Sequence, residues 1–468
     1  MKYFSTRDAS QQKRSFTEVL LEGLAPDGGL YVPETYPEVS KDLLTKFRYL
    51  TYKQMAYEII SLFVGDAIES SDLKKLIHKT YSASVFGSES VTPVEQISNG
   101  IYLQDLSTGP SLAFKDLAMQ FLGHAMDYEL SRRGQTLTIL GASSGDTVSA
   151  AEEAMRGKEC INVVMLTPRD GMSSFQKAQA GSILDDNIFN IALAAPFDRC
   201  QDLVKSINKD IPFKQKYKIG AVNSINWGRI CAQIVYYFKG YLSITNSNDE
   251  WIDAVVPSGN FGNVLAAYIA KKMGLPIRRL IVSTNENDVL DVFFKTGTYQ
   301  QKSVKVTSSP SMDISKASNI ERYFFDLLDR NANVLSDYMS EFETTKQIDF
   351  SELLAKIQIE TGFFSGASNH QERLSIIQKI YQASQRVIDP HTAAGVKVAL
   401  EYQQKDDSLP YLCVETAKPT KFEEAIQEAL GFLPKRPAQF IGLEDKQQRF
   451  FDLNDHEDDI KSFIVERL

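Results

Sequence analysis

The sequence predicts an α/β protein built on parallel sheets, with a mostly helical N-terminal domain before them. The prediction rests on two similar stretches, 136–157 (TLTILGASSGDTVSAAEEAMRG) and 251–274 (WIDAVVPSGNFGNVLAAYIAKKMG). In each, a short apolar run leads to a loop of small residues, an alanine-rich helix and a glycine that can end the helix. Another apolar run returns after each helix, at 161–166 and 280–283. Strand, loop, helix and strand make the βαβ unit, which implies a parallel sheet.

Length and composition limit the possible functions. The chain has 468 residues, of which 43% are hydrophobic and 24% charged, as expected for a soluble globular enzyme of two or three domains. A net charge of −9 argues against nucleic acid or an anionic membrane as the main partner. No apolar stretch approaches the ~20 residues of a membrane span. The four cysteines lie far apart without C-x-x-C spacing, so we expect no disulfide framework, no metal site and a cytoplasmic location.

Three parts are expected along the chain. Before about residue 95, the segments 52–63 and 71–81 alternate apolar and polar residues at helical spacing and carry no catalytic cluster. Further along, the apolar runs at 189–193 and 411–415 are typical of short buried strands. The predicted parts are an N-terminal domain over 1–95, a first αβ lobe over 96–220, and a second αβ lobe over 221–468 with a helical insert at about 330–385.

The loops that follow the two predicted strands, 141–147 and 258–263, are where chemistry is expected. Glycine lets the backbone approach a ligand closely, and the first turn of a helix presents unpaired N–H groups at the positive end of its dipole. Together these features hold anions. Two such loops suggest two anions, such as a cofactor phosphate and a substrate carboxylate. The alternative is two ordinary turns that bind nothing, and neither loop matches the G-x-x-x-x-G-K-[ST] or G-x-G-x-x-G fingerprint.

Lys115 is the leading candidate for covalent chemistry. It follows the apolar residues 112–114 and stands at the start of a predicted helix. Helical N–H dipoles and an apolar approach disfavour the charged ammonium and leave a neutral, nucleophilic amine. The alternative is a solvated surface lysine, which is the usual environment of this residue type.

Asn226 and His391 each stand at the start of a predicted helix, and capping or packing is the simpler interpretation of both. The amide of Asn226 is also placed to reach the oxygens of a ligand. Thr416 directly follows the predicted strand 411–415.

Taken together, these features resemble one enzyme family. A lysine after phenylalanine at a helix start (FKD), an SSGDT loop, an SGNFGN loop and a threonine after a late strand occur here in the order typical of threonine synthases. The resemblance is to the long microbial form and runs from LLEGLAPDGGLYVPE through NSINWGR, SNIERYF and DPHTAAG to ETAKPTKF, essentially the whole chain. It implies a fold-type II pyridoxal-phosphate enzyme, with the α/β fold shared with tryptophan synthase β-chains and serine dehydratases.

The resemblance implies a site for pyridoxal 5′-phosphate. Lys115 would carry the cofactor covalently and act as a base once substrate displaces it. Thr416 would hydrogen-bond the pyridine nitrogen, and Asn226 is a candidate to bond the phenolic oxygen. The second loop would hold the cofactor phosphate through Ser258, Gly259, Asn260, Phe261, Gly262 and Asn263.

The implied reaction converts O-phospho-L-homoserine and water to L-threonine and phosphate, by γ-elimination and then β-addition of water. The first loop would receive the substrate carboxylate through Ser143, Ser144, Asp146 and Thr147. Asp146 stands where many relatives carry asparagine, and because an anion repels a carboxylate we expect Asp146 to cap the helix instead. The substrate phosphate needs its own site, for which the candidates are Lys177, Arg229, Arg322, Asn285, Ser311 and His391.

Other functions compete with this reaction. A threonine-synthase-like phospholyase would use the same site on the same class of substrate but release 2-oxobutyrate and ammonia with the phosphate. A catalytically silent scaffold is disfavoured because Lys115, the SGNFGN loop and Thr416 are all present. A dehydratase of unphosphorylated serine or threonine is disfavoured by the N-terminal segment and the SGD loop. The family implies a monomer or a homodimer.

Overall fold

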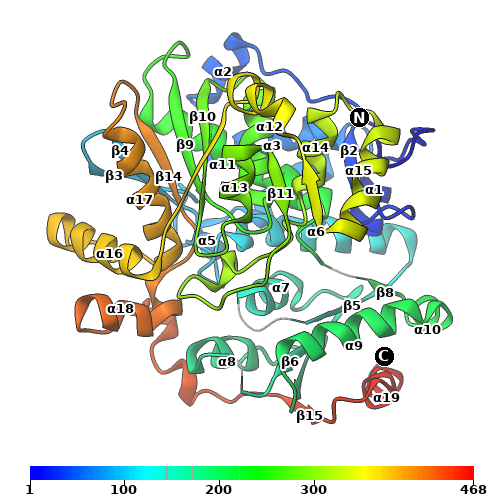
Figure 1. Ribbon diagram of the computed structural model, residues 1–468. Helices are drawn as coiled ribbons and strands as arrows, with labels where there is room; N and C mark the ends of the chain where they lie inside the picture. The colour runs from blue at the N-terminus through cyan, green and yellow to red at the C-terminus, as the bar shows by residue number, and fades with distance from the viewer. Residues whose placement is uncertain (143–145, 171, 221) are drawn as a thin grey trace. The chain divides into compact units, whose positions relative to one another are not determined.

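The chain forms two compact units (Figure 1). The computed structural model describes residues 1–142, 146–170, 172–220 and 222–468, without the side chain of Asp146. None of the described helices is long and apolar enough to cross a membrane. Unit 1 comprises Met1–Val19, Leu24–Phe114 and Ser224–Lys435, and unit 2 comprises Leu20–Gly23, Lys115–Asn223 and Arg436–Leu468.

Unit 1 contains a six-stranded sheet in the order β13-β10-β9-β14-β4-β3. Neighbouring strands are parallel except for the edge strand β3, which forms an antiparallel hairpin with β4. The central strands β9 and β14 are buried along their whole length, as in parallel sheets that are covered on both faces. The strands of this sheet are β3 (Val94–Ser98), β4 (Ile101–Asp105), β9 (Ile252–Pro257), β10 (Ile277–Thr284), β13 (Phe363–Ala367) and β14 (Tyr411–Glu415). Two short antiparallel pairs join β1 (Tyr3–Ser5) to β2 (Tyr31–Pro33) and β11 (Thr298–Gln300) to β12 (Gln347–Asp349).

The helices of unit 1 include an N-terminal set, α1 to α5, which precede the first strand of the large sheet, and α3 and α4 correspond to the predicted segments 52–63 and 71–81. Helix α11 packs against α3 and α12, and α17 packs against β9, β10 and β14. The helices are α1 (Phe16–Glu22), which begins in this unit, α2 (Lys41–Phe47), α3 (Tyr52–Val64), α4 (Ser70–Thr80), α5 (Ala83–Phe86), α11 (Trp227–Ile244), α12 (Gly262–Lys272), α13 (Val289–Thr296), α14 (Ile320–Leu327), α15 (Ala332–Thr345), α16 (His370–Ser384), α17 (Pro390–Gln403) and α18 (Glu423–Leu430). Short helical turns are η1 (Pro310–Met312), η2 (Ser351–Leu353), η3 (Lys356–Glu360) and η4 (Pro419–Phe422).

Unit 2 contains a five-stranded sheet in the order β15-β7-β6-β5-β8, and all its pairs are parallel. One apolar core joins β5, β6 and β7 to the inner faces of α9 and α19. The strands are β5 (Leu137–Ala142), β6 (Ile161–Pro168), β7 (Ile188–Leu193), β8 (Ile219–Gly220) and β15 (Phe451–Leu453). The helices and turns are α6 (Lys115–Arg133), α7 (Asp146–Met155), α8 (Ser174–Gly181), α9 (Phe197–Lys209), α10 (Ile211–Lys216), α19 (Glu457–Arg467), η5 (Ala438–Phe440) and η6 (Leu443–Asp445).

Both predicted βαβ units are present, as β5–α7–β6 in unit 2 and β9–α12–β10 in unit 1. Gly157 and Gly274 follow the two helices at φ +64° and +103°, which a residue with a side chain rarely adopts, and the helices end there as predicted. The parallel pairing of the flanking strands confirms the α/β class.

The structure places three segments differently from the predicted boundaries. Residues 96–114, expected in the first lobe, belong to unit 1, because β4 pairs with β14 there. Residues 436–468, expected in the second lobe, belong to unit 2, where β15 extends the sheet beside β7. The predicted helical insert also contains a strand, β13, because its apolar Phe363 and its neighbours pair with β10 at the sheet edge.

Candidate active site

The loop 258–263 joins β9 to α12 at the carboxyl end of the parallel sheet of unit 1. Phe261 lies in the left-handed region at φ +64°, a strained conformation for a bulky residue, and the chain turns into α12 there. The ring of Phe261 is buried against Phe294 and Phe363, with centroid distances of 5.9 and 5.6 Å. This packing holds the turn, and the N–H groups of the first turn of α12 are left at the mouth of the loop.

Two side chains of this loop keep buried polar atoms without a hydrogen-bond partner in the described part of the chain, namely the Ser258 hydroxyl and Nδ2 of Asn263. Tyr236 and Tyr237 of α11 orient Asn263, since their hydroxyls donate to its Oδ1 at 2.5 and 2.6 Å. The amide nitrogen of Asn263 is thereby left as a donor. Unsatisfied buried donors beside a helix N-terminus are what an anionic ligand requires.

A second loop, which ends at Asn319, packs against this one. Asn319 donates to the Asn260 carbonyl through both its backbone N–H and its Nδ2, at 3.1 Å each. The carbonyl oxygen of Ser311 lies so close to Gly259 that a Cβ there would stand 2.8 Å from it. Gly262 is less crowded, because the nearest atom to a Cβ would be the Asn319 amide nitrogen at 3.3 Å. Position 259 therefore requires glycine more strictly than position 262 does.

Two deeply buried arginines of unit 1 differ in their partners. Arg322 of α14 donates to the carbonyls of Tyr31 and Ile225 and to Oδ1 of Asn319, at 2.8, 2.6 and 2.7 Å. Arg229, in the first turn of α11, has no ion-pair partner among the described residues, and its Nε has no hydrogen bond there. Burial lowers the pKa of Arg229 to about 10. An unpaired buried cation is costly, so Arg229 is better placed than Arg322 to bind an external anion.

Thr416 follows β14, and the segment that leads into Lys115 is attached to it. The Thr416 carbonyl accepts the backbone N–H of Phe114 at 2.9 Å. Beside this bond, Ala113 and Ala417 form an antiparallel bridge. The backbone immediately before Lys115 is therefore fixed to the end of a central strand.

The predicted residues of unit 2 are described only in part. Lys115 begins α6, as predicted, and is partly buried. Thr147 lies in the first turn of α7, whereas Ser143, Ser144 and the side chain of Asp146 lie outside the described residues. Lys177 of α8 holds its ammonium 5.6 Å from the centre of the Phe450 ring.

His391 and Asn285, two candidates for the substrate phosphate, are bonded within unit 1. His391 Nδ1 lies 2.8 Å from Asp389 Oδ1, and its Nε2 accepts the backbone N–H of Ser311 at 3.1 Å. A ring bonded in this way has no N–H left for a phosphate, which does not favour the predicted role. Nδ2 of Asn285 likewise donates to Thr307, Ser309 and Asp313. Asn226 caps α11 by accepting the Gly228 N–H at 2.9 Å, as the simpler interpretation predicted.

The sequence analysis gave no role to Tyr236, Tyr237 or Asn319, although all three hold the 258–263 loop. Asn319 lies in the SNIERYF motif that contributed to the resemblance, which was a usable signal. The two tyrosines lie on a helix that is buried on all sides, so no periodic pattern distinguishes them.

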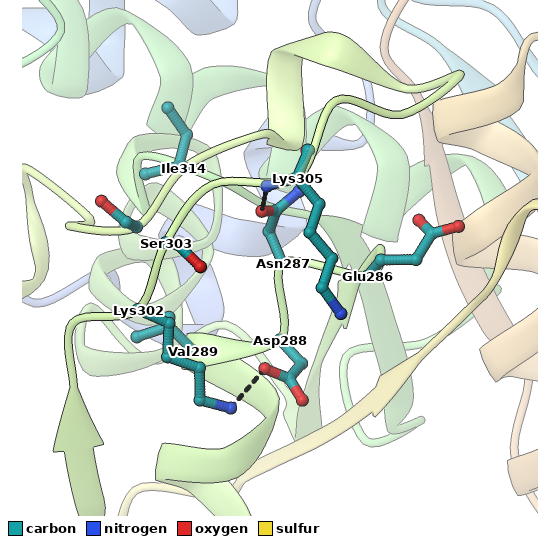
Figure 2. A pocket seen from close by; sticks show the side chains of 9 residues that line it. Glu286, Asn287, Asp288, Val289, Lys302, Ser303, Lys305 and Ile314 are labelled. Atoms are coloured by element: carbon teal, nitrogen blue, oxygen red, sulfur yellow. Dashed lines mark hydrogen bonds and ion pairs between the residues drawn. The ribbon is translucent and has the colours of Figure 1, made fainter.

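A cavity of about 130 Å³ also opens beyond the end of β10 (Figure 2). Lys302 and Asp288 form an ion pair of 2.6 Å on its wall. It is lined by Glu286, Asn287, Asp288, Val289, Lys302, Ser303, Lys305, Ile314 and Ser315. No predicted site residue lines it, and Ile314 separates it from Gly259, where a Cβ would lie 2.9 Å from the isoleucine side chain.

The 258–263 loop fits a phosphorylated ligand, because the Ser258 hydroxyl, the Asn263 amide and the N-terminus of α12 supply donors around one glycine-lined mouth. Residues 85–368, more than half of the chain, match the family model described as pyridoxal-phosphate dependent enzyme. The chain is therefore a pyridoxal-phosphate-dependent enzyme of fold-type II.

Within this class the chain belongs to the threonine synthase family, and it is a lyase. Residues 2–81 match the model for the threonine synthase N terminus, and residues 392–464 match the model for the threonine synthase C-terminal region. The threonine synthase of Methylobacillus glycogenes is 50% identical over 480 residues, which cover 100% of both chains. That of Corynebacterium glutamicum is 47% identical over 481 residues, covering 100% of this chain and 99% of its own. The crystal structure of PLP-bound threonine synthase from Brucella melitensis aligns with 100% of this chain and 99% of its own, at a TM-score of 0.95 and 35% identity.

Proposed function

We propose that this chain catalyses the threonine synthase reaction, the conversion of O-phospho-L-homoserine and water to L-threonine and phosphate, in the cytoplasm. The observation that supports this most directly is the unpaired, buried Arg229 in the same unit as the donors of the 258–263 loop. A phosphorylated substrate that reacts on a phosphorylated cofactor needs two such anion sites. We expect the enzyme to act as a monomer or a homodimer.

We assign cofactor binding to residues that can form hydrogen bonds with the polar groups of pyridoxal phosphate. The phosphate binds at loop 258–263, through the Ser258 hydroxyl, the Asn263 amide and the N–H groups that begin α12. Thr416 bonds the pyridine nitrogen with a neutral hydroxyl, which leaves that nitrogen less protonated than a carboxylate would. Asn226 is assigned to the phenolic oxygen. When bound, pyridoxal phosphate withdraws electrons from the substrate and acidifies the protons near its α-carbon.

The substrate is held at its two charged ends. The loop 143–147 is assigned to the carboxylate through Ser143, Ser144 and Thr147, and Asp146, the first residue of α7, is assigned a capping role. Arg229 takes the phosphate, because an anion at that position would neutralise an otherwise unpaired buried cation. Lys177 is a weaker candidate, since its ammonium already lies over an aromatic ring.

Lys115 is assigned the proton transfers. With its amine free, it would take one proton from Cα and one from Cβ while phosphate leaves from Cγ, and return one to Cγ, which becomes the methyl group, and one to Cα. Water then adds at Cβ. The attachment of Phe114 to the Thr416 carbonyl limits how far the backbone before the lysine can move during these steps.

The reaction is tested by mixing the purified protein with pyridoxal phosphate and O-phospho-L-homoserine and analysing the products by mass spectrometry. We expect threonine and phosphate from the wild type and from Lys41→Ala, a control that removes an exposed lysine from the start of α2. Lys115→Ala should form neither product. Release of 2-oxobutyrate and ammonia with the phosphate would instead identify a phospholyase, and an unreactive protein that binds cofactor would identify a silent scaffold.

The role of Arg229 is tested by the matched pair Arg229→Met and Arg322→Met. We expect Arg229→Met to raise KM for the phosphorylated substrate by about a hundredfold while leaving the protein as stable as the wild type, because a buried charge without a protein partner is removed. Arg322→Met should destabilise unit 1 by about 3 kcal/mol, because the carbonyls and the amide it serves lose their donors. An unchanged KM in Arg229→Met would exclude this residue from the phosphate site.

A further inference from the structure

We propose that His391 is a positioning residue for the cofactor site, a neutral hydrogen-bond acceptor that fixes the loop 308–314 over Gly259. The inference rests on the proposed assignment of the cofactor phosphate to loop 258–263. It explains what fixes the segment that packs on that loop. This role takes the place of the prediction that His391 binds the substrate phosphate.

The hydrogen bonds of His391 define its protonation. Nε2 lies 3.1 Å from the backbone nitrogen of Ser311, whose N–H can only donate. The ring nitrogen must therefore offer a lone pair, which a charged imidazolium does not have. The single ring proton is then on Nδ1, where it donates to Asp389 Oδ1 at 2.8 Å. The side chain is a neutral imidazole in one defined tautomer.

Asp389 is itself held in place, so the tautomer is set by the fold. Its Oδ1 also accepts the backbone N–H of His391 at 2.9 Å, and its Oδ2 accepts the hydroxyl and the N–H of Thr392. These bonds make Asp389 the N-cap of α17. Asp389, His391 and Thr392 are all buried, at 0%, 2% and 0% exposure, so water does not compete for these bonds.

The bond to Ser311 connects this cap to the proposed phosphate loop. The Ser311 N–H is held by His391, and the carbonyl of the same residue is the nearest atom to a Cβ placed at Gly259, at 2.8 Å. The Cα of Met312 and the side chain of Ile314 complete the same contact, at 3.0 and 2.9 Å. Loss of the acceptor would leave the part-buried Ser311 N–H without this partner and free the segment that covers Gly259.

The His391 ring also packs on the segment that follows Thr416. The centres of the His391 and Phe422 rings are 4.7 Å apart. Phe422 is buried and ends the turn η4, which begins three residues after Thr416. One imidazole thus contacts the segments next to both proposed cofactor contacts, the phosphate loop and the pyridine threonine.

Cofactor affinity provides the first test. Apoenzyme is titrated with pyridoxal phosphate, and binding is followed by cofactor absorbance, for His391→Leu, His391→Gln and the control His78→Gln, which changes an exposed histidine of α4. We expect His391→Leu to bind about tenfold more weakly, because it has no acceptor for the Ser311 N–H. Glutamine can place an oxygen near the position of Nε2, so His391→Gln should stay within about threefold of the wild type. At saturating cofactor, kcat of His391→Leu should return close to the wild-type value, as expected for a residue that does not touch the reacting atoms.

Ser258→Ala separates this inference from the proposed function. If Ser258→Ala weakens cofactor binding and His391→Leu does not, the His391 inference fails while the loop assignment stands. If neither variant weakens binding, the loop assignment itself is wrong. If both weaken it, both are supported.

A spectroscopic measurement needs no destabilising variant. The chain has five histidines, so ¹⁵N-labelled histidine gives few side-chain signals. We expect one signal of a neutral ring protonated at Nδ1, which disappears in His391→Gln. A ring protonated at Nε2, or a charged ring, at the signal that this variant removes would overturn the proposal.

Discussion

The two βαβ units have the same order of elements but keep their unsatisfied polar groups in different places. In β9–α12–β10 of unit 1, the buried donors without a described partner include Ser258 and Asn263, at the mouth of the loop where the strand ends and the helix begins, and the hydroxyls of Ser283 and Thr284 at the end of β10. In β5–α7–β6 of unit 2, neither carboxyl oxygen of Glu152 has a hydrogen bond of good geometry in the part of the chain that is described. Glu152 lies well inside α7 and is fully buried.

The position of an unsatisfied polar group in the fold determines whether a ligand can reach it. At the end of a parallel strand, an unsatisfied donor faces the edge where α/β proteins bind ligands, and an anion can satisfy it. Inside a helix that is packed on a sheet, no ligand can arrive. Burial raises the pKa of Glu152 well above its usual value, and Asn190 on β7 opposes that shift only in part. Burial thus favours the protonated form of the interior group, whereas an anionic ligand can satisfy the group at the mouth.

The largest effect is expected where the loop of unit 1 is held in its strained turn. Phe261→Ala should destabilise unit 1 by about 3–5 kcal/mol, because a buried ring that packs on Phe294 and Phe363 is lost. Phe261→Gly should cost about 1 kcal/mol less, since glycine adopts φ +64° without strain. Urea unfolding followed by tryptophan fluorescence reports on unit 1, which contains both tryptophans of the chain, Trp227 and Trp251.

Phe363 on β13 is the matched control for this pair. It contributes to the same aromatic cluster from an extended strand. There, glycine should be the worse replacement by about 0.5–1 kcal/mol, because it loses more backbone entropy on folding. The same order of alanine and glycine at both positions would mean that the turn at Phe261 is not strained.

The interior acid of unit 2 should give the next largest effect. Glu152→Gln keeps the shape of the side chain and removes the need to retain a proton. The folded wild type holds this proton while the unfolded chain loses it above about pH 4.3, so wild-type stability falls with rising pH relative to the variant, by up to about 1.4 kcal/mol per pH unit. Hydrogen exchange of α7 and β7 peptides, compared between the two proteins at each pH, measures the difference. Equal protection at every pH would mean that Glu152 is ionised in the folded state.

The sequence was sufficient to predict the βαβ units because each is local. An apolar run, a small-residue loop, an alanine-rich helix and a final glycine occur within about 25 residues, and Gly157 and Gly274 end their helices as that pattern requires. The strands β13 and β15 were missed for the opposite reason. Each is short, and β15 joins a sheet whose other strands lie more than two hundred residues earlier in the chain. A local pattern does not say which distant edge a three-residue strand will meet.

The candidate site, too, was predictable from the sequence only where its features are local. The residue types and spacing of loop 258–263 predicted an anion site, but they could not show that Tyr236 and Tyr237 orient Asn263. Arg229 and Arg322 were both candidates from the sequence, which could not rank them firmly. Only the carbonyl oxygens around them distinguish the two, and those come from segments far apart in the chain.

Substitution of one glycine in each βαβ unit tests whether the loop 258–263 of unit 1 is packed more tightly than the end of β5 in unit 2. A Cβ at Gly259 would meet backbone atoms, the Ser311 carbonyl at 2.8 Å and the Met312 Cα at 3.0 Å. At Gly141, which lies in β5, it would meet only the flexible end of Met165, with Sδ at 3.0 Å. Gly259→Ala should therefore weaken pyridoxal phosphate binding about a hundredfold, and Gly141→Ala by less than about threefold. Titration of the apoenzymes measures both, and a larger loss in Gly141→Ala would reverse the comparison.

The last of these effects concerns a buried acid in unit 1 that forms an ion pair with an arginine. Glu415 ends β14, just before Thr416, and its Oε2 accepts Nη2 of Arg386 at 2.5 Å. Burial raises the pKa of Glu415 to about 7, with Asp105 adding to the shift while Lys418 and Arg386 oppose it. The carboxyl therefore ionises within the ordinary pH range.

The pKa of Glu415 predicts the shape of the pH dependence of stability. Between about pH 5 and pH 7, the wild type should lose stability relative to Glu415→Gln, because the unfolded carboxyl has released its proton while the folded one has not. Above about pH 7 both are ionised and the difference should become constant, at a total of about 3.5 kcal/mol. Tryptophan fluorescence in urea, which reports on unit 1, measures it at each pH. A difference that keeps growing would show that Arg386 and Lys418 do not compensate the buried charge, and no difference would show that they keep Glu415 ionised throughout.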